Sequence, residues 1–157
     1  MKKIFFFSLI CLMALTVNAQ WVDLGLPSGT LWKNRNEDAG YYTYEQAVNK
    51  FGNSLPTKEQ WEELQNKCRW TWTGSGYKVV GPNGQSIYLS AEGIRNCNGD
   101  VYDVVSRGYY WSSTPDGSDA AWGLDFYSDY VGVDYNGRCG GQSVRLVQRG
   151  DVIKPRR

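Results

Sequence analysis

Residues 122–138 read WGLDFYSDYVGVDYNGR, and this stretch carries the clearest signal for the fold. Leu124 and Phe126 alternate with polar or aromatic residues, and Val131 and Val133 do the same a few positions later. A repeat of two is the pattern of a β-strand with one buried face. The stretch therefore predicts two strands, over residues 122–126 and 130–134.

Outward from this stretch, the second half of the chain continues to predict short strands. Turns rich in Gly, Asn, Asp and Pro separate the apolar runs, and Gly81-Pro-Asn-Gly84 carries the Asn-Gly signal of a hairpin. Residues 93–108 are too irregular for an element and too long for a plain connector, a kind of loop that is usually functional or tied by a disulfide. The further strands are expected at 77–80, 86–89, 109–112 and 143–147, with two more at 21–24 and 31–33.

The first half predicts two helices, each opened by a capping box. Thr43 stands three residues before Gln46 and opens a helix over 44–51, and Thr57 relates to Gln60 in the same way at the start of 58–67. Two early helices followed by antiparallel strands predict an α+β fold, with the two helices packed on a twisted antiparallel sheet and long loops.

The N-terminus has the pattern of a signal peptide. Lys2 and Lys3 precede an apolar run over 4–16, and small residues lead to Ala19. The run is too short for a membrane anchor, which needs about 20 residues. We expect a signal peptide at 1–19, one domain at 20–148 and a basic tail at 149–157. The product is expected to be secreted or periplasmic with no membrane insertion after cleavage, and attachment to the cell surface stays open.

Composition narrows the function classes. The formal net charge is +1, and loss of Lys2 and Lys3 leaves −1, which gives no reason to expect nucleic acid as a partner. The chain has no histidine, so the commonest general base and the commonest zinc ligand are both missing. Asp116 and Asp119 offer oxygens for a structural calcium ion, but they lack the alternating acidic pattern of a dedicated loop. We predict no enzyme, no catalytic residue, no cofactor and no assigned metal ligand.

Three cysteines remain after residue 19. Cys68 follows the apolar face of the second predicted helix and is expected to be a shielded free thiol. Cys97 and Cys139 both lie in loops rich in Gly or Asn and are the more plausible disulfide pair in an oxidising compartment.

An ordered set of motifs resembles the Fibrobacter succinogenes major paralogous domain family, exported proteins abundant in gut Bacteroidetes. The resemblance covers nearly all of the chain after residue 19, and it implies a C-type-lectin-like fold and a surface-exposed location, without a reaction. The sequence departs from the family pattern at 91–95, at Cys97 and Cys139, and in a shortened segment between Tyr42 and Thr43. The motifs are WVDLGLPSGTLW (21–32), LPTKEQWEEL (55–64), CRWTW (68–72), GYKV (76–79), GPNG (81–84), GYYWSST (108–114) and SVR (143–145).

The opening stretch is also the candidate binding face. Tyr, Asp, Asn, Gly and Arg on a strand scaffold make the mixture that adaptable recognition surfaces use. We expect a non-catalytic binding module for a protein or glycan, of unassigned oligomeric state. Two alternatives stay open: a structural or decorating subunit of a surface assembly such as a pilus, and a retroelement-diversified variable protein, since 123–141 contains no Lys, Glu, Gln, Met or Trp. The expected ligand-binding residues are Trp122, Asp125, Tyr127, Asp129, Tyr130, Asp134, Tyr135, Asn136 and Arg138.

Overall fold

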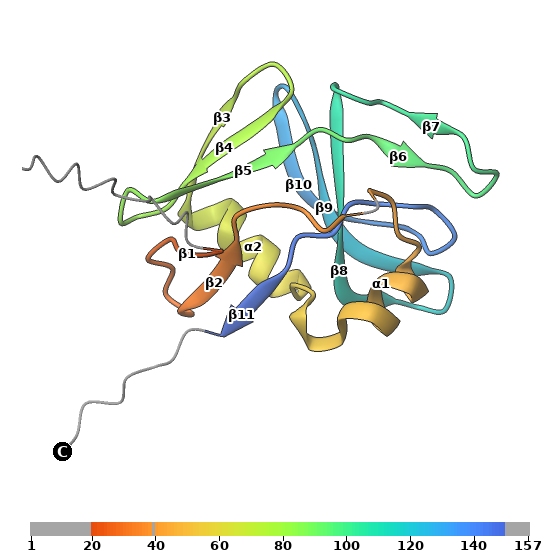
Figure 1. Cartoon of the computed structure of the whole chain (residues 1–157), viewed down its shortest axis with the longest axis horizontal. Coiled ribbons are helices and arrows are strands. Elements are labelled where there is room, and N and C mark those ends of the chain that lie inside the picture. Colours follow the sequence, from red (N-terminus) through yellow and green to blue (C-terminus); the bar gives the residue numbers. More distant parts are fainter. Residues whose placement is uncertain (1–19, 39, 150–157) are drawn as a thin grey trace, which may run out of the picture.

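The computed structural model describes residues 20–38 and 40–149 (Figure 1). The expected signal peptide at 1–19 and the expected tail from residue 150 onward lie outside the described residues. The elements in chain order are β1 (Trp21–Asp23), β2 (Thr30–Lys33), α1 (Tyr44–Phe51), the 3-10 helix η1 (Gly52–Ser54), α2 (Lys58–Lys67), β3 (Arg69–Trp72), β4 (Gly76–Val80), β5 (Ser86–Ser90), β6 (Ile94–Arg95), β7 (Val101–Tyr102), β8 (Arg107–Asp116), β9 (Ala120–Tyr127), β10 (Tyr130–Gly137) and β11 (Val147–Arg149).

Both helices have the bounds predicted from the sequence, and each begins at its capping box. The Thr43 hydroxyl accepts a hydrogen bond from the Gln46 amide at 3.2 Å, and the Gln46 side chain accepts one from the Thr43 amide at 2.9 Å. Thr57 and Gln60 repeat the arrangement at the start of α2. Each box satisfies backbone donors that a helix start leaves unpaired.

The strands form four small antiparallel sheets within the described part of the chain. Three of these sheets have three strands, in the orders β1-β2-β11, β3-β4-β5 and β10-β9-β8, and β6 pairs with β7 alone. Most partners are hairpin neighbours, but β2 also pairs with β11, which follows it by more than 100 residues.

The expected fold class, an α+β, C-type-lectin-like arrangement of two helices on one twisted antiparallel sheet, is wrong. The structure is 46% strand and 16% helical, so strand dominates, and its strands divide among four sheets. All the described strands outside β8, β9 and β10 have five residues or fewer, and they pair within small separate sheets.

Two strand assignments also need correction. The segment 93–108, expected to be irregular, contains the short hairpin of β6 and β7 and the start of β8. The strand expected at 143–147 begins only at Val147, as β11, and the residues before it make isolated bridges such as Tyr110 with Ser143. Arg149, placed in the tail by the sequence, is the last residue of β11.

The main core lies between α2 and one face of the β10-β9-β8 sheet, which is the long sheet at the centre of Figure 1. Trp61 and Leu64 of α2 are fully buried in the same cluster as Leu124 and Phe126 of β9. A second cluster, around Trp111 of β8, includes buried residues of α1. Together the two clusters fix the long sheet as a rigid support.

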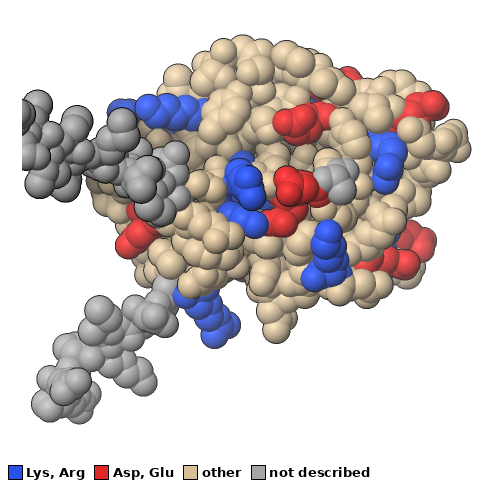
Figure 2. Space-filling view, viewed as in Figure 1, with Lys and Arg blue, Asp and Glu red and all other residues tan. Residues whose placement is uncertain are grey.

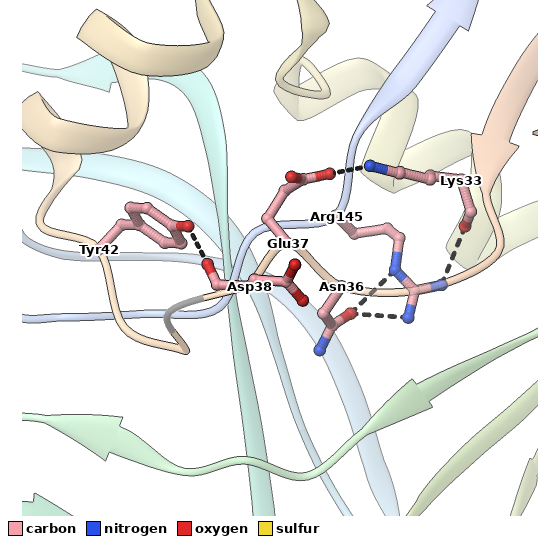
Figure 3. A network of polar contacts seen from close by, with 6 residues as sticks. All are labelled: Lys33, Asn36, Glu37, Asp38, Tyr42 and Arg145. Atoms are coloured by element: carbon pink, nitrogen blue, oxygen red, sulfur yellow. Dashed lines mark hydrogen bonds and ion pairs between the residues drawn. The ribbon is translucent and has the colours of Figure 1, made fainter. Parts of the chain in front are cut away.

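A buried arginine joins segments that are distant in sequence (Figure 3). Arg145 is 2% exposed, and its Nε and one terminal nitrogen both donate to Asn36 Oδ1, at 2.9 and 2.7 Å. It also donates to the carbonyl oxygens of Lys33 and Tyr88. Burial lowers the pKa of this guanidinium, so its four hydrogen bonds are what offset the cost of removing it from water.

Candidate functional site

The β10-β9-β8 sheet has two faces, and strand alternation assigns each residue of the predicted site to one of them. Leu124 and Phe126 face α2, where both are buried. Trp122 has the same parity as these two, and it pairs across the sheet with Tyr135. Trp122 and Tyr135 therefore belong to the α2 face.

The opposite face carries a stack of aromatic rings and a guanidinium, here called the Tyr–Arg face: Arg107, Tyr109, Asp125, Tyr127 and Tyr130. Arg107 pairs with Tyr127, which pairs with Tyr130, so the three lie in one row across the sheet. The rings of Tyr127 and Tyr130 stack at 5.1 Å and 22°. The Arg107 guanidinium lies 5.0 Å from the Tyr127 ring centroid and 5.5 Å from that of Tyr109.

Asp125 occupies the centre of the Tyr–Arg face. Its carboxylate lies 3.6 Å from the Arg107 guanidinium. Burial raises the pKa of Asp125; Arg107 opposes this shift, and Asp134 and Asp103 add to it. Asp125 Oδ1 and Arg107 Nε are both buried, and neither has a hydrogen-bond partner among the described residues. Both atoms lie beneath the surface of the face, so they add to the burial of this charged pair and do not themselves contact solvent.

Tyr109 closes this face on the β8 side. Its hydroxyl donates to Asp103 Oδ2 at 3.2 Å, and burial, followed by the charge of Asp125, raises the pKa of Tyr109 to about 12. The hydroxyl therefore stays protonated and keeps donating at neutral pH.

A glycine positions the outermost ring. A Cβ atom built at Gly132 would collide with the hydroxyl end of Tyr130, so the Tyr130 ring lies over Gly132. Beside the stack, Ser106, Arg107, Tyr127 and Ser128 line a hollow of about 470 Å³. The face therefore combines an exposed edge of stacked rings with a shallow recess.

The other predicted site residues lie in several places. Asp134 and Asn136 share the parity of Tyr130 on β10, and Asp129 lies in the turn between β9 and β10. Arg138 lies elsewhere: it rests 4.8 Å from the Tyr44 ring and donates to the carbonyl oxygens of Gly117 and Ala120.

Trp122 and Tyr135, which lie on the α2 face, are partly covered by other side chains. The Lys58 ammonium lies 3.6 Å from the Trp122 ring centroid, and Trp122 meets the Tyr135 ring edge-on at 5.6 Å. Tyr135 nevertheless keeps 56% of its surface exposed. The predicted set is thus split between the two sides of the sheet.

Three residues of the site escaped sequence reasoning. Arg107, Tyr109 and Asp103 come from β8 and the loop before it, and they meet the predicted residues only through strand pairing. The signal available was the alternation of Arg107 and Tyr109, although only Tyr109 lay in a predicted strand (109–112).

The cysteines behave as expected for an oxidising compartment. Cys97 and Cys139 form a disulfide, which confirms the predicted pair. Cys68 is free and half-buried, and burial, followed by the charge of Glu63, raises its pKa to about 11.

Neither a cluster of metal-ligating side chains nor a membrane-spanning helix occurs among the described residues. No group of three or more His, Cys, Asp or Glu side chains gathers there in a way that could hold a metal ion. Within residues 20–38 and 40–149, no helix has the length and apolar character needed to cross a membrane. Figure 2 shows acidic and basic side chains interspersed on the viewed face rather than gathered into one basic stripe.

Comparison with known proteins gives one match. Residues 72–147 match the family model described as a domain of unknown function (DUF8237). This segment is just under half of the 157 residues, and it contains the whole Tyr–Arg face. Neither the curated proteins nor the solved structures contain a match to the chain.

Proposed function

We propose that the protein is a non-catalytic binding module that recognises a protein partner through the Tyr–Arg face. The observation that carries the proposal is the row of Arg107, Tyr127 and Tyr130, held on the longest strands and backed by the main core. Tyr and Arg are enriched among residues that dominate binding energy, and a rigid support lowers the entropy lost on binding.

The adjoining loop favours a protein over a glycan as the partner. Val104 and Val105, two to three residues before Arg107, are 51% and 54% exposed, which adds apolar surface next to the aromatic row. Val105 also has a φ of +72°, which is rare for a β-branched residue. Hydrogen bonds from Val105 N to the Ala91 carbonyl and from Arg107 N to the Asp103 carbonyl hold this loop in place.

Export is part of the proposal. The Cys97–Cys139 disulfide suits an oxidising compartment, in agreement with the signal peptide expected at 1–19. The module would therefore meet its partner outside the cytoplasm.

The test begins by finding the partner and then compares matched variants. The protein is screened against envelope and secreted proteins and against a glycan array, and affinities are measured for the wild type, Tyr127→Ala/Tyr130→Ala and Tyr135→Ala. Each lost ring on the Tyr–Arg face is expected to cost about 2 kcal/mol or more, roughly 30-fold in affinity. Tyr135→Ala removes an exposed ring from the opposite face and serves as the control.

Three outcomes contradict the proposal. A partner that loses affinity with Tyr135→Ala but not with the double variant would move the site to the α2 face. Binding to the glycan array alone, lost in Tyr127→Ala/Tyr130→Ala, would change the ligand class of the Tyr–Arg face. Association only with copies of itself or with one fixed assembly would support the structural-subunit alternative.

A further inference from the structure

A second hollow, distinct from the Tyr–Arg face, lies between α1 and β6. Its volume is about 660 Å³, and it is called here the cationic hollow. The described residues that line it include two cations and no carboxylate. They are Tyr41, Tyr42, Gln46, Asn49, Lys50 and Arg95.

Both cations rest on aromatic rings. The Arg95 guanidinium lies 5.9 Å from the Tyr41 ring centroid, and one of its nitrogens donates to the Tyr41 carbonyl at 3.3 Å. The Lys50 ammonium lies 5.4 Å from the Tyr42 ring centroid and 5.3 Å from that of Phe51. Cation–π contact orients these groups without neutralising their charge.

Neither cation has an acidic partner among the described residues: the ion pairs found there are Lys33–Glu37, Lys58–Glu62 and Arg107–Asp125. Two positive charges that form no ion pair, at one hollow, favour an anionic group, and a guanidinium pairs well with a carboxylate.

The backbone groups of Arg95 at the edge of the hollow are already hydrogen-bonded, so a ligand there has to be recognised by side chains. The Arg95 amide donates to the Gly141 carbonyl at 2.9 Å, and the Gly141 amide donates back to the Arg95 carbonyl at 2.7 Å. An extended peptide therefore cannot add to β6 at Arg95 by strand pairing. A compact ligand bound by side-chain groups fits the site better.

Two amides complete the hollow. Gln46 Oε1 accepts a hydrogen bond from the Thr43 backbone, which leaves the NH2 end of this side chain for a ligand. Asn49 is exposed on the same helix. Amides can both donate to and accept from hydroxyl groups, so the site offers partners for hydroxyls beside partners for an anion.

We propose that the cationic hollow binds an acidic saccharide, a short sugar chain whose units carry carboxylates. Arg95 and Lys50 bind a carboxylate, and Gln46 and Asn49 bind hydroxyls. The volume lies within the range of about 300–1,000 Å³ that is usual for small-molecule sites. The site stands apart from the protein-binding proposal, because its lining comes from α1, the segment before it and β6.

The probe is a trisaccharide of galacturonate, compared with the neutral galactose trisaccharide of the same linkage. Calorimetry on the wild type should show binding of the acidic probe that weakens as salt rises, and no binding of the neutral one. Lys50→Glu and Arg95→Gln should each weaken binding at least tenfold. Lys67→Glu is the matched control, because Lys67 is exposed in the last turn of α2 as Lys50 is in the last turn of α1.

Arg95 also holds the Tyr41 carbonyl, so loss of binding in Arg95→Gln has to be read beside Lys50→Glu, which alters an exposed side chain with no hydrogen bond or ion pair among the described residues. Amide chemical-shift mapping with the probe should locate the changes at the cationic hollow. The proposal is overturned by equal binding of both trisaccharides, by no binding at millimolar concentration, by equal affinity for a tri-glutamate peptide, or by shift changes confined to the Tyr–Arg face. None of these results alters the test of the protein partner.

Discussion

At the scale of single residues, the Tyr–Arg face depends on the absence of a side chain at Gly132. The Tyr130 ring occupies the space that a Cβ atom at residue 132 would need. In this placement the Tyr130 ring stacks on the Tyr127 ring. The colliding group is the far end of a flexible side chain, which can move aside at little cost.

We therefore predict that Gly132→Ala separates the two tyrosine rings while changing the free energy of unfolding by less than about 1 kcal/mol. Ring-proton shifts of Tyr127 and Tyr130 would report the separation, and denaturant titration would report stability. Unchanged ring shifts, or a loss of several kcal/mol, would mean that the ring is not held as described.

Asp125 gives a prediction for pH. Because burial raises the pKa of Asp125 in the folded state above its ordinary value of 3.8, the folded state binds this proton more tightly than the unfolded state just above pH 4. The contribution of Asp125 to the free energy of unfolding is thus fully present below about pH 4, the pKa of an unfolded Asp, and is lost as pH rises through the higher folded pKa. Asp125→Asn should gain stability relative to the wild type between pH 3.5 and pH 7.

Denaturant titrations of both proteins at the two pH values measure this difference. The exposed Asp100→Asn variant, in the loop between β6 and β7, supplies the baseline. A difference that changes in the opposite direction would mean that the Arg107 charge outweighs burial.

At the scale of elements, local signals were predictable and non-local ones were not. The starts of α1 and α2 follow from capping boxes that involve four neighbouring residues. The hairpin of β6 and β7 was missed because each strand has two residues, and β6 depends on a bridge to Gly141, far along the chain. Residues 143–146 are buried, but they form no regular strand and make only isolated bridges such as that of Ser143 with Tyr110.

The site shows the same division. The residue types in 122–138 suggested a recognition surface, and their alternation alone could have separated Trp122 and Tyr135 from Asp125, Tyr127 and Tyr130. The contribution of Arg107 required the register of β8 against β9, which no local pattern contains.

The capping boxes lead to a prediction for the helices. Helices of eight and ten residues are not stable alone, so their starts matter to the whole domain. Thr43→Ala and Thr57→Ala should each lower the free energy of unfolding by about 1 kcal/mol, whereas Thr57→Ser should be close to the wild type because it keeps the hydroxyl. Thermal or urea unfolding measures the change, and equal losses for Ala and Ser would show that the threonine methyl group, rather than the cap, matters.

At the scale of the whole molecule, covalent and polar links join segments that no sheet connects. The disulfide spans 42 positions, from the turn between β6 and β7 to the segment after β10. Arg145 similarly joins the segment after β2 to β5.

We predict that the double variant Cys97→Ser/Cys139→Ser loses about 4 kcal/mol of unfolding free energy, since a loop of this length gains that much conformational freedom when the unfolded chain is no longer cross-linked. Cys68→Ser removes a thiol that has no covalent partner and is the control. Denaturant unfolding of the oxidised wild type and the two variants makes the comparison. Equal stability of the wild type and the double variant would show that the bridge does not restrain the unfolded chain.

The position of β11 beside β2 has a consequence for synthesis of the chain. β2 gains its second neighbour only from residues 147–149, at the end of the described chain. Until the ribosome has released those residues, one edge of β2 has unpaired amides and carbonyls, and such an edge can pair with another polypeptide. A chain that ends before Val147 would therefore be a target for chaperones and for aggregation, and pairing of β2 on both edges has to wait until this last strand is available.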